Sequence, residues 1–198
     1  MFSTGRTITL GLILLFAVAC ATTHVPPADA AGEVASYLIA GEVNKAESRF
    51  DDIDSGDDQD VAFNVLYSQA QSLYDQRDYA SAARVLRFLM ERYEDKRAPK
   101  EALLLTLTLQ SAREGKPPEG DELKEMNELA KELREGVENP PVWIDLVATH
   151  DAIDQGNLTA ARASLARFQA RFDGNPVSLT EYAEELERYL ASNGGGEG

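Results

Sequence analysis

Residues 73–93, LYDQRDYASAARVLRFLMERY, contain two helical patterns joined by a short turn. After the turn at Arg77-Asp78-Tyr79, apolar residues return every three or four positions, which is the spacing of one buried helix face. A small residue, Ala82, opens the second helix. The segment therefore predicts a pair of antiparallel helices that share an apolar face. The apolar positions of the second helix are Ala82, Val85, Leu86, Leu89, Met90 and Tyr93.

The same local design recurs along the chain. Three further segments end an apolar helix, turn, and open the next helix with a small residue: residues 38–46 (LIAGEVNKA), 111–123 (SAREGKPPEGDEL) and 152–161 (AIDQGNLTAA). The equivalent turn positions lie 36, 38 and 41 residues apart, at Gly41, Arg77, Gly115 and Gly156. A repeat of this length predicts stacked helical hairpins, because one such unit cannot bury its apolar face alone.

One stretch, residues 103–109 (LLLTLTL), alternates in the manner of a β-strand. Its flanking segments have helical composition, and no other part of the sequence offers a partner strand. We therefore predict a helix here as well.

The C-terminal part predicts a capping helix. Ser178-Leu-Thr-Glu181 has the spacing of a capping box, and the helix that follows has one apolar and one charged face, as the end of a repeat array requires. Residues 192–198 (SNGGGEG) are predicted to be a disordered tail. The fold class predicted is all-α, with about four helical hairpins and a C-terminal capping helix over residues 32–191.

Residues 1–19 have the pattern of a secretory signal peptide. A short basic start precedes an apolar run, residues 8–18 (ITLGLILLFAV), that is too short to span a bilayer as a helix. Ala17-Val18-Ala19-Cys20 then resembles a bacterial lipobox, where a lipoprotein precursor is cut before a lipid-modified cysteine. Ala17 and Ala19 also fit an ordinary signal-peptidase site, and an uncleaved anchor is a third interpretation. We favour lipidation of Cys20, because the chain's sole cysteine stands where a lipobox requires it.

Residues 20–31 are predicted to be a tether between the lipid and the helical domain. The eleven residues after Cys20 could span at most about 35 Å, so the domain should lie close to the membrane. Pro26-Pro27 would stiffen this segment toward polyproline II. In the lipoproteins that the lipobox resembles, Asp after the cysteine tends to retain the protein in the inner membrane. This chain has Ala21 there, so the resemblance implies a lipid-anchored protein of the outer membrane that faces the periplasm.

Residues 73–93 resemble a tetratricopeptide (TPR) repeat. The matching features are a small residue where the two helices meet (Ala70), the turn at Arg77-Asp78-Tyr79, and Ala82, Leu86 and Leu89 on the second helix. Residues 150–172 give a second match. Together with Cys20, the pattern resembles TPR lipoproteins of the outer membrane, such as the BamD type of the β-barrel assembly machine and the pilotins that deliver secretins. The resemblance implies a superhelical array that binds a protein.

Composition excludes several classes of function. The chain carries 34 acidic against 19 basic side chains, a net charge of −15, so it lacks the clustered cations that nucleic acid requires. One cysteine and two histidines leave little for a transition-metal site. No nucleotide-binding or hydrolase motif is present. We therefore expect neither enzyme activity nor a cofactor or resident metal.

Two clusters of titratable residues have simple structural explanations. Residues 50–60 (FDDIDSGDDQD) hold six aspartates, but Gly56 and Phe63 stand where an EF-hand starting at Asp52 needs oxygen ligands. An exposed loop with Asp60 near a helix start is therefore predicted instead of a calcium site. His150 and Asp154 are four residues apart and are predicted to form a pair at the surface or in the groove, without a catalytic role.

The TPR resemblance implies a partner-binding groove along the first helix of each hairpin. Its predicted residues are Tyr67, Gln71, Tyr74, Leu146, His150 and Ile153. No Lys or Arg precedes the turn in these helices, so a basic clamp for a terminal carboxylate is missing. Aromatic residues with acidic surroundings suit an extended or helical polypeptide, and a basic one in particular.

We therefore expect a lipid-anchored periplasmic scaffold or adaptor that binds a protein partner at the outer membrane, during envelope or outer-membrane protein assembly. A different class remains open at this point, namely a small-ligand binding or transport accessory lipoprotein. That class would need a closed apolar pocket between hairpins.

Overall fold

The computed structural model describes residues 25–115, 117–135 and 137–193. Within these residues the protein is entirely helical, without a β-strand, which confirms the predicted all-α class. The helices are α1 (Pro27–Ile39), α2 (Val43–Asp51), α3 (Asp57–Asp75), α4 (Tyr79–Arg92), α5 (Arg97–Glu114), α6 (Gly120–Arg134), α7 (Ile144–Asp154), α8 (Leu158–Arg171) and α9 (Val177–Asn193).

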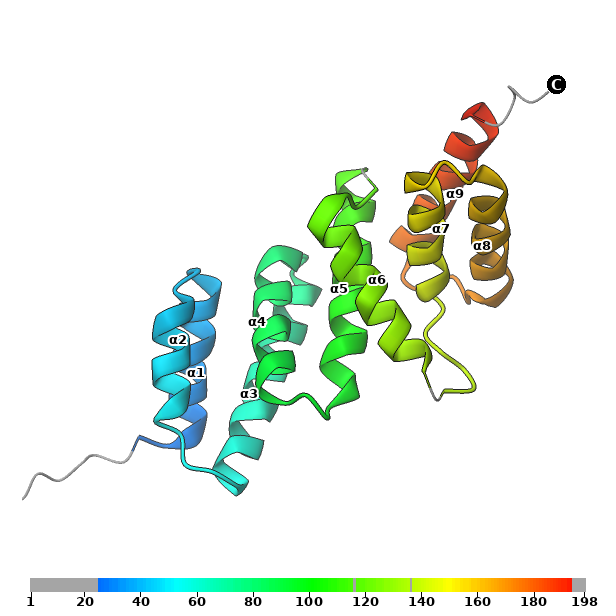
Figure 1. Cartoon of the computed structure of the whole chain (residues 1–198). Helices are drawn as coiled ribbons and strands as arrows, with labels where there is room; N and C mark the ends of the chain where they lie inside the picture. Colours follow the sequence, from blue (N-terminus) through cyan, green and yellow to red (C-terminus); the bar gives the residue numbers. More distant parts are fainter. Residues whose placement is uncertain (1–24, 116, 136, 194–198) are drawn as a thin grey trace, which may run out of the picture.

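Consecutive helices pack in pairs, and the pairs follow one another in a row from α1/α2 at one end to α7/α8 at the other (Figure 1). α1 contacts both α3 and α4, and α4 contacts α5. At the C-terminal end α9 packs on α8 and also reaches back to α5. Each pair therefore buries an apolar face against the next one.

Helix α5 confirms the predicted helix over residues 103–109. It is buried on several sides, and α4, α6, α7 and α9 all pack against it. Two threonines on this helix satisfy their hydroxyls internally: Thr106 donates to the carbonyl of Ala102 and Thr108 to that of Leu104, each at 2.7 Å. The threonines give the sequence its strand-like alternation, and their hydroxyls are hydrogen-bonded to carbonyls of the same helix.

Helix α5 also joins two hydrophobic clusters. Leu103, Leu104 and Leu107 belong to a cluster that extends from α1 to the start of α7, whereas Leu109 belongs to a second cluster among α7, α8 and α9. The core is therefore divided between two regions that meet at α5 and also at α7, which contributes Ile144 and Val147 to the first cluster and Leu146 and Ala152 to the second.

The four turn positions identified from the repeat spacing share one backbone conformation. Gly41, Arg77, Gly115 and Gly156 have φ angles of 79°, 61°, 63° and 70°, all in the left-handed region. After three of these turns, the next backbone N–H donates to the carbonyl five residues earlier, at 2.8 Å for Glu42, 2.9 Å for Asp78 and 2.7 Å for Asn157. This is the Schellman pattern of a helix C-terminus, and it gives the three hairpins the same geometry.

The hairpins α3/α4 and α7/α8 agree further at the start of the second helix. Asp78 accepts a hydrogen bond from the backbone N–H of Ser81 (3.2 Å), and Asn157 accepts one from that of Ala160 (3.0 Å). Both side chains act as N-caps. In both hairpins the left-handed residue is therefore followed directly by the N-cap residue of the next helix. These are the two segments whose sequences match the TPR pattern best.

The ends of the helical domain differ from the predicted boundaries. Helix α1 begins at Pro27, and Ala30 and Ala31 are buried, so residues 27–31 belong to the domain and not to a tether. Proline fits the first position of a helix because its missing N–H would have no partner there. At the other end, α9 includes Ser192 and Asn193, which were predicted to be tail.

The predicted capping box is also wrong in register. Helix α9 begins at Val177, so Ser178 lies inside its first turn instead of before it. The predicted signal peptide (residues 1–19), Cys20 and residues 194–198 lie outside the described residues.

Arg77 is the sole non-glycine residue with positive φ in the described part of the chain. A residue with a side chain is strained by about 1–2 kcal/mol in this conformation. Glycine avoids the strain, but it loses more conformational entropy on folding, which offsets about 0.5–1 kcal/mol of that gain. Arg77→Gly should therefore raise the free energy of unfolding by roughly 0.5–1 kcal/mol. Urea unfolding measures this, with Arg77→Ala as the control that keeps the strain. Equal stabilisation by both substitutions would contradict the explanation.

Candidate functional site

A cleft of about 530 Å³ lies between α3 and α5, next to Trp143. The residues that α3 contributes include the three predicted from sequence, Tyr67, Gln71 and Tyr74. From α5 come Ala98, Glu101, Ala102 and Leu105, and Leu86 of α4 completes the lining together with Ala70 and Asp75 of α3. The structure thus brings together half of the predicted groove residues in one concave site.

The two tyrosines of the cleft also take part in packing. The ring of Tyr67 stacks on that of Phe63, with centroids 5.7 Å apart and planes within 7°. Tyr74 meets the ring of Tyr79 edge to face at 5.8 Å. Both side chains are partly buried against the hydrophobic clusters. A substitution that removes either ring would therefore disturb the fold, whereas Tyr→Phe changes the hydroxyl alone.

The charged residues that line the cleft are acidic: Asp75 and Glu101 line it, and no Lys, Arg or His of the described residues does. The pKa of Tyr67 is raised, first by burial and then by the charge of Glu101. The pKa of Tyr74 is also raised, first by burial and then by Tyr79 and Asp75. Each tyrosine hydroxyl therefore lies within the field of a carboxylate.

Trp143 forms the side of the cleft nearest α7, directly before that helix begins. Its indole Nε1 is buried and has no hydrogen-bond partner among the described residues. Trp143 is not among the groove residues predicted from the sequence. The sequence does contain a signal for its place in the cleft, because a tryptophan at the start of a helix can lie between two helical pairs.

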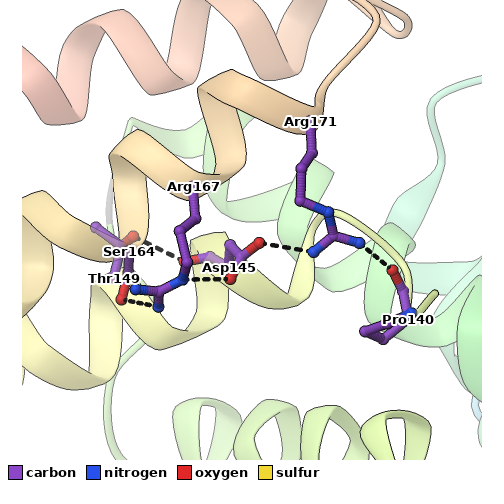
Figure 2. A network of polar contacts seen from close by, with 6 residues as sticks. All are labelled: Pro140, Asp145, Thr149, Ser164, Arg167 and Arg171. Atoms are coloured by element: carbon purple, nitrogen blue, oxygen red, sulfur yellow. Dashed lines mark hydrogen bonds and ion pairs between the residues drawn. The ribbon is translucent and has the colours of Figure 1, made fainter. Parts of the chain in front are cut away.

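A polar network holds the backbone on both sides of Trp143 (Figure 2). Asp145, which is buried, forms ion pairs with Arg167 (3.3 Å) and Arg171 (3.0 Å) of α8. Arg171 also donates to the carbonyl of Pro140 at 2.6 Å. One arginine thus connects a residue before Trp143 to a residue after it. The α7/α8 hairpin thereby positions the indole against the cleft.

A second cleft, of about 730 Å³, continues from the first. Tyr74 and Asp75 line both clefts, and the second one extends between the end of α3, α5 and the start of α9. Its other charged lining residues are Arg77, Arg113, Glu181 and Glu185. The two clefts together give a longer groove than a small molecule requires.

The other predicted groove residues lie elsewhere. Leu146 is 0% and His150 1% exposed, and Ile153 is partly buried against the second hydrophobic cluster. None of these residues lines either cleft, and the buried Leu146 and His150 are covered by packing instead of facing a groove.

The predicted pairing of His150 with Asp154 is wrong. His150 Nε2 instead lies 3.0 Å from the hydroxyl of Tyr182 on α9. His150 Nδ1 is buried and has no hydrogen-bond partner in the described part of the chain. Burial lowers the pKa of His150 to about 4, so this histidine is neutral near pH 7.

The aspartates of residues 51–60 are distributed among the end of α2, the loop that follows it and the start of α3. Asp51 pairs with Arg92 (3.0 Å) and Asp60 with Lys96 (3.4 Å). Asp57, Asp58 and Asp60 lie in the first turn of α3, where the helix dipole favours negative charge. Among the residues that the structure describes, no three His, Cys, Asp or Glu side chains come together as metal ligands would.

Comparison with known proteins adds no identification: no protein-family model, no curated protein and no solved structure matches this chain. In the described ranges, every helix is too short or too polar to cross a bilayer.

The buried neutral His150 predicts a pH-dependent stability. Its pKa of about 4 lies below the ordinary value of 6.5, so the unfolded state gains a proton first as the pH falls. The stabilisation is complete above pH 6.5 and is lost as the pH falls toward 4. Between pH 7 and pH 5 the free energy of unfolding should fall by about 2 kcal/mol more in the natural protein than in His150→Gln, which does not titrate.

Urea unfolding at the two pH values measures this difference. His150→Gln is the matched control because its amide can still reach the hydroxyl of Tyr182. The same loss of stability in both proteins would contradict a buried, neutral His150.

Proposed function

We propose that this protein is a TPR-like helical adaptor that binds a segment of a protein partner in the cleft between α3 and α5. The observation that carries the proposal is the cleft itself, in which Tyr67, Tyr74 and Trp143 surround a concave surface of about 530 Å³. Partly buried aromatic side chains provide large contact areas at low entropic cost, and they are common in sites that bind polypeptides.

The continuation of this cleft past Tyr74 favours a polypeptide over a small ligand. A volume of about 530 Å³ alone would suit a drug-sized molecule. The second cleft of about 730 Å³ shares Tyr74 and Asp75 with it and leads toward α9. An elongated groove of this kind can hold several residues of an extended chain or one face of a helix.

The repeated turn geometry supports a TPR-like architecture. Three hairpins share the left-handed residue and the hydrogen bond that follows it, at the positions that the sequence resemblance indicates. Such repeats provide a rigid surface for binding and do not require reactive side chains.

We further propose that a lipid on Cys20 anchors the adaptor to the outer membrane, on the periplasmic side. Helix α1 begins at Pro27, and the seven residues from Cys20 to Pro27 could span at most about 25 Å. The domain would then stay near the membrane, and anchoring would raise the effective concentration of any partner there. An adaptor of this kind fits a role in envelope or outer-membrane protein assembly.

Site-specific photo-crosslinking tests the proposal in intact bacteria. A photoreactive amino acid in place of Gln71, which is exposed and lines the cleft, should form a covalent adduct with one defined polypeptide. The matched control is the same amino acid in place of Ala166, an exposed position on α8 that lines neither cleft. Adducts at both positions alike, or at neither, would contradict binding in the cleft.

Fractionation of the same cells tests the anchor. The protein should sediment with outer membranes, and Cys20→Ser should release it into the soluble fraction. Sedimentation of Cys20→Ser with membranes would contradict lipidation.

A further inference from the structure

The charged side chains that line the α3–α5 cleft are acidic. Two carboxylates, Asp75 and Glu101, line it, and among the residues that the structure describes no cationic side chain does. Another acidic cleft of the protein differs in containing cations. It is lined by four glutamates, Glu91, Glu94, Glu125 and Glu132, and by Arg87 and Lys100, which form the ion pairs Arg87–Glu125 at 2.6 Å and Lys100–Glu132 at 2.8 Å.

The two carboxylates of the α3–α5 cleft keep unused acceptor capacity. Asp75 is exposed and has no hydrogen-bond or ion-pair partner in the part of the chain that the structure describes. Glu101 is paired with Arg97 through Oε1 (2.5 Å), while its Oε2 accepts no hydrogen bond from the described residues. Each carboxylate could therefore bind a ligand cation without breaking an internal ion pair.

Three aromatic side chains accompany these carboxylates. Tyr67, Tyr74 and Trp143 line the same cleft, and aromatic faces attract cations through their quadrupole. They also offer apolar surface to the methylene groups of a long cationic side chain. The raised pKa values of Tyr67 and Tyr74, which follow from burial and then from nearby negative charges, are in keeping with a site that favours a cation.

We propose that the α3–α5 cleft selects a basic segment of the partner, and that its aromatic residues and the carboxylates of Asp75 and Glu101 bind Arg or Lys side chains of that segment. This inference rests on the proposed function and names the chemistry of the segment. A site built for a terminal carboxylate would prefer an anionic group, whereas this cleft would prefer a cationic one.

The protein's sole tryptophan makes the proposal directly measurable, because Trp143 lines the cleft. Hexa-arginine and hexa-lysine contain no fluorophore, so a saturable change in tryptophan fluorescence reports their binding. We expect such a change with the basic peptides, and none with hexa-glutamate. The absence of any change with basic peptides, or an equal change with hexa-glutamate, would overturn the proposal.

Matched variants separate the cleft from the general attraction of an acidic protein. Asp75→Asn with Glu101→Gln should weaken binding of hexa-arginine roughly tenfold or more. Glu119→Gln with Glu184→Gln removes the same charge at exposed positions outside both clefts and should leave binding within about twofold. Equal weakening in both double variants would overturn the proposal. Circular dichroism and urea unfolding establish that each variant is folded.

Two further experiments test whether the bound cation belongs to a polypeptide and whether the tyrosine rings contribute to binding. Spermine carries ammonium groups without a peptide backbone, and binding as tight as that of hexa-arginine would overturn the assignment to a polypeptide. Tyr67→Phe with Tyr74→Phe keeps the ring faces and should retain binding; a loss equal to that of the carboxylate variant would overturn the aromatic part of the site.

The two proposals can fail separately. A crosslink from Gln71 to a polypeptide, together with failure of basic peptides to bind, would leave the proposed function standing and remove this inference. Failure of both the crosslink and the peptides would remove both.

Discussion

Burial of α5 on several sides is the interaction on which the arrangement of the other helices depends. Leu103, Leu104 and Leu107 complete one hydrophobic cluster, and Leu109 completes the other. A helix can be buried in this way only if its polar side chains have partners, and the threonine hydroxyls find theirs in the preceding turn of the same helix. The N-terminal and C-terminal pairs of helices are thereby held on one central element.

The cleft is a consequence of the small residues that face it. Ala98 and Ala102 of α5 and Ala70 of α3 line it, and their short side chains leave space that larger residues would fill. Tyr67 and Tyr74 border this space while packing on Phe63 and Tyr79. On the remaining side, the ion pairs of Asp145 and the contact from Arg171 to Pro140 fix the backbone around Trp143. The same packing that supports the fold therefore shapes the site.

Much of the fold follows from local signals in the sequence. The repeat spacing identified Gly41, Arg77, Gly115 and Gly156 as equivalent, and all four are left-handed, including the arginine. The site was only partly predictable, because helix periodicity shows which residues share a face but not what covers that face. The repeat makes Leu146 and His150 equivalent to Tyr67 and Gln71. They are buried because α7 is covered where α3 is open, and His150 reaches Tyr182 of α9. Trp143 was missed for the same reason, since its place in the cleft depends on contacts between distant parts of the chain.

Native-state hydrogen exchange in low concentrations of urea tests the central position of α5 most directly. If α5 holds both clusters together, the amides of residues 103–111 should exchange only through global unfolding, with the highest protection in the protein. The helices at the two ends, α1/α2 and α8/α9, should open with smaller free energies. Exchange of the α5 amides through a local opening, at a lower free energy than those of α4 or α7, would contradict this account.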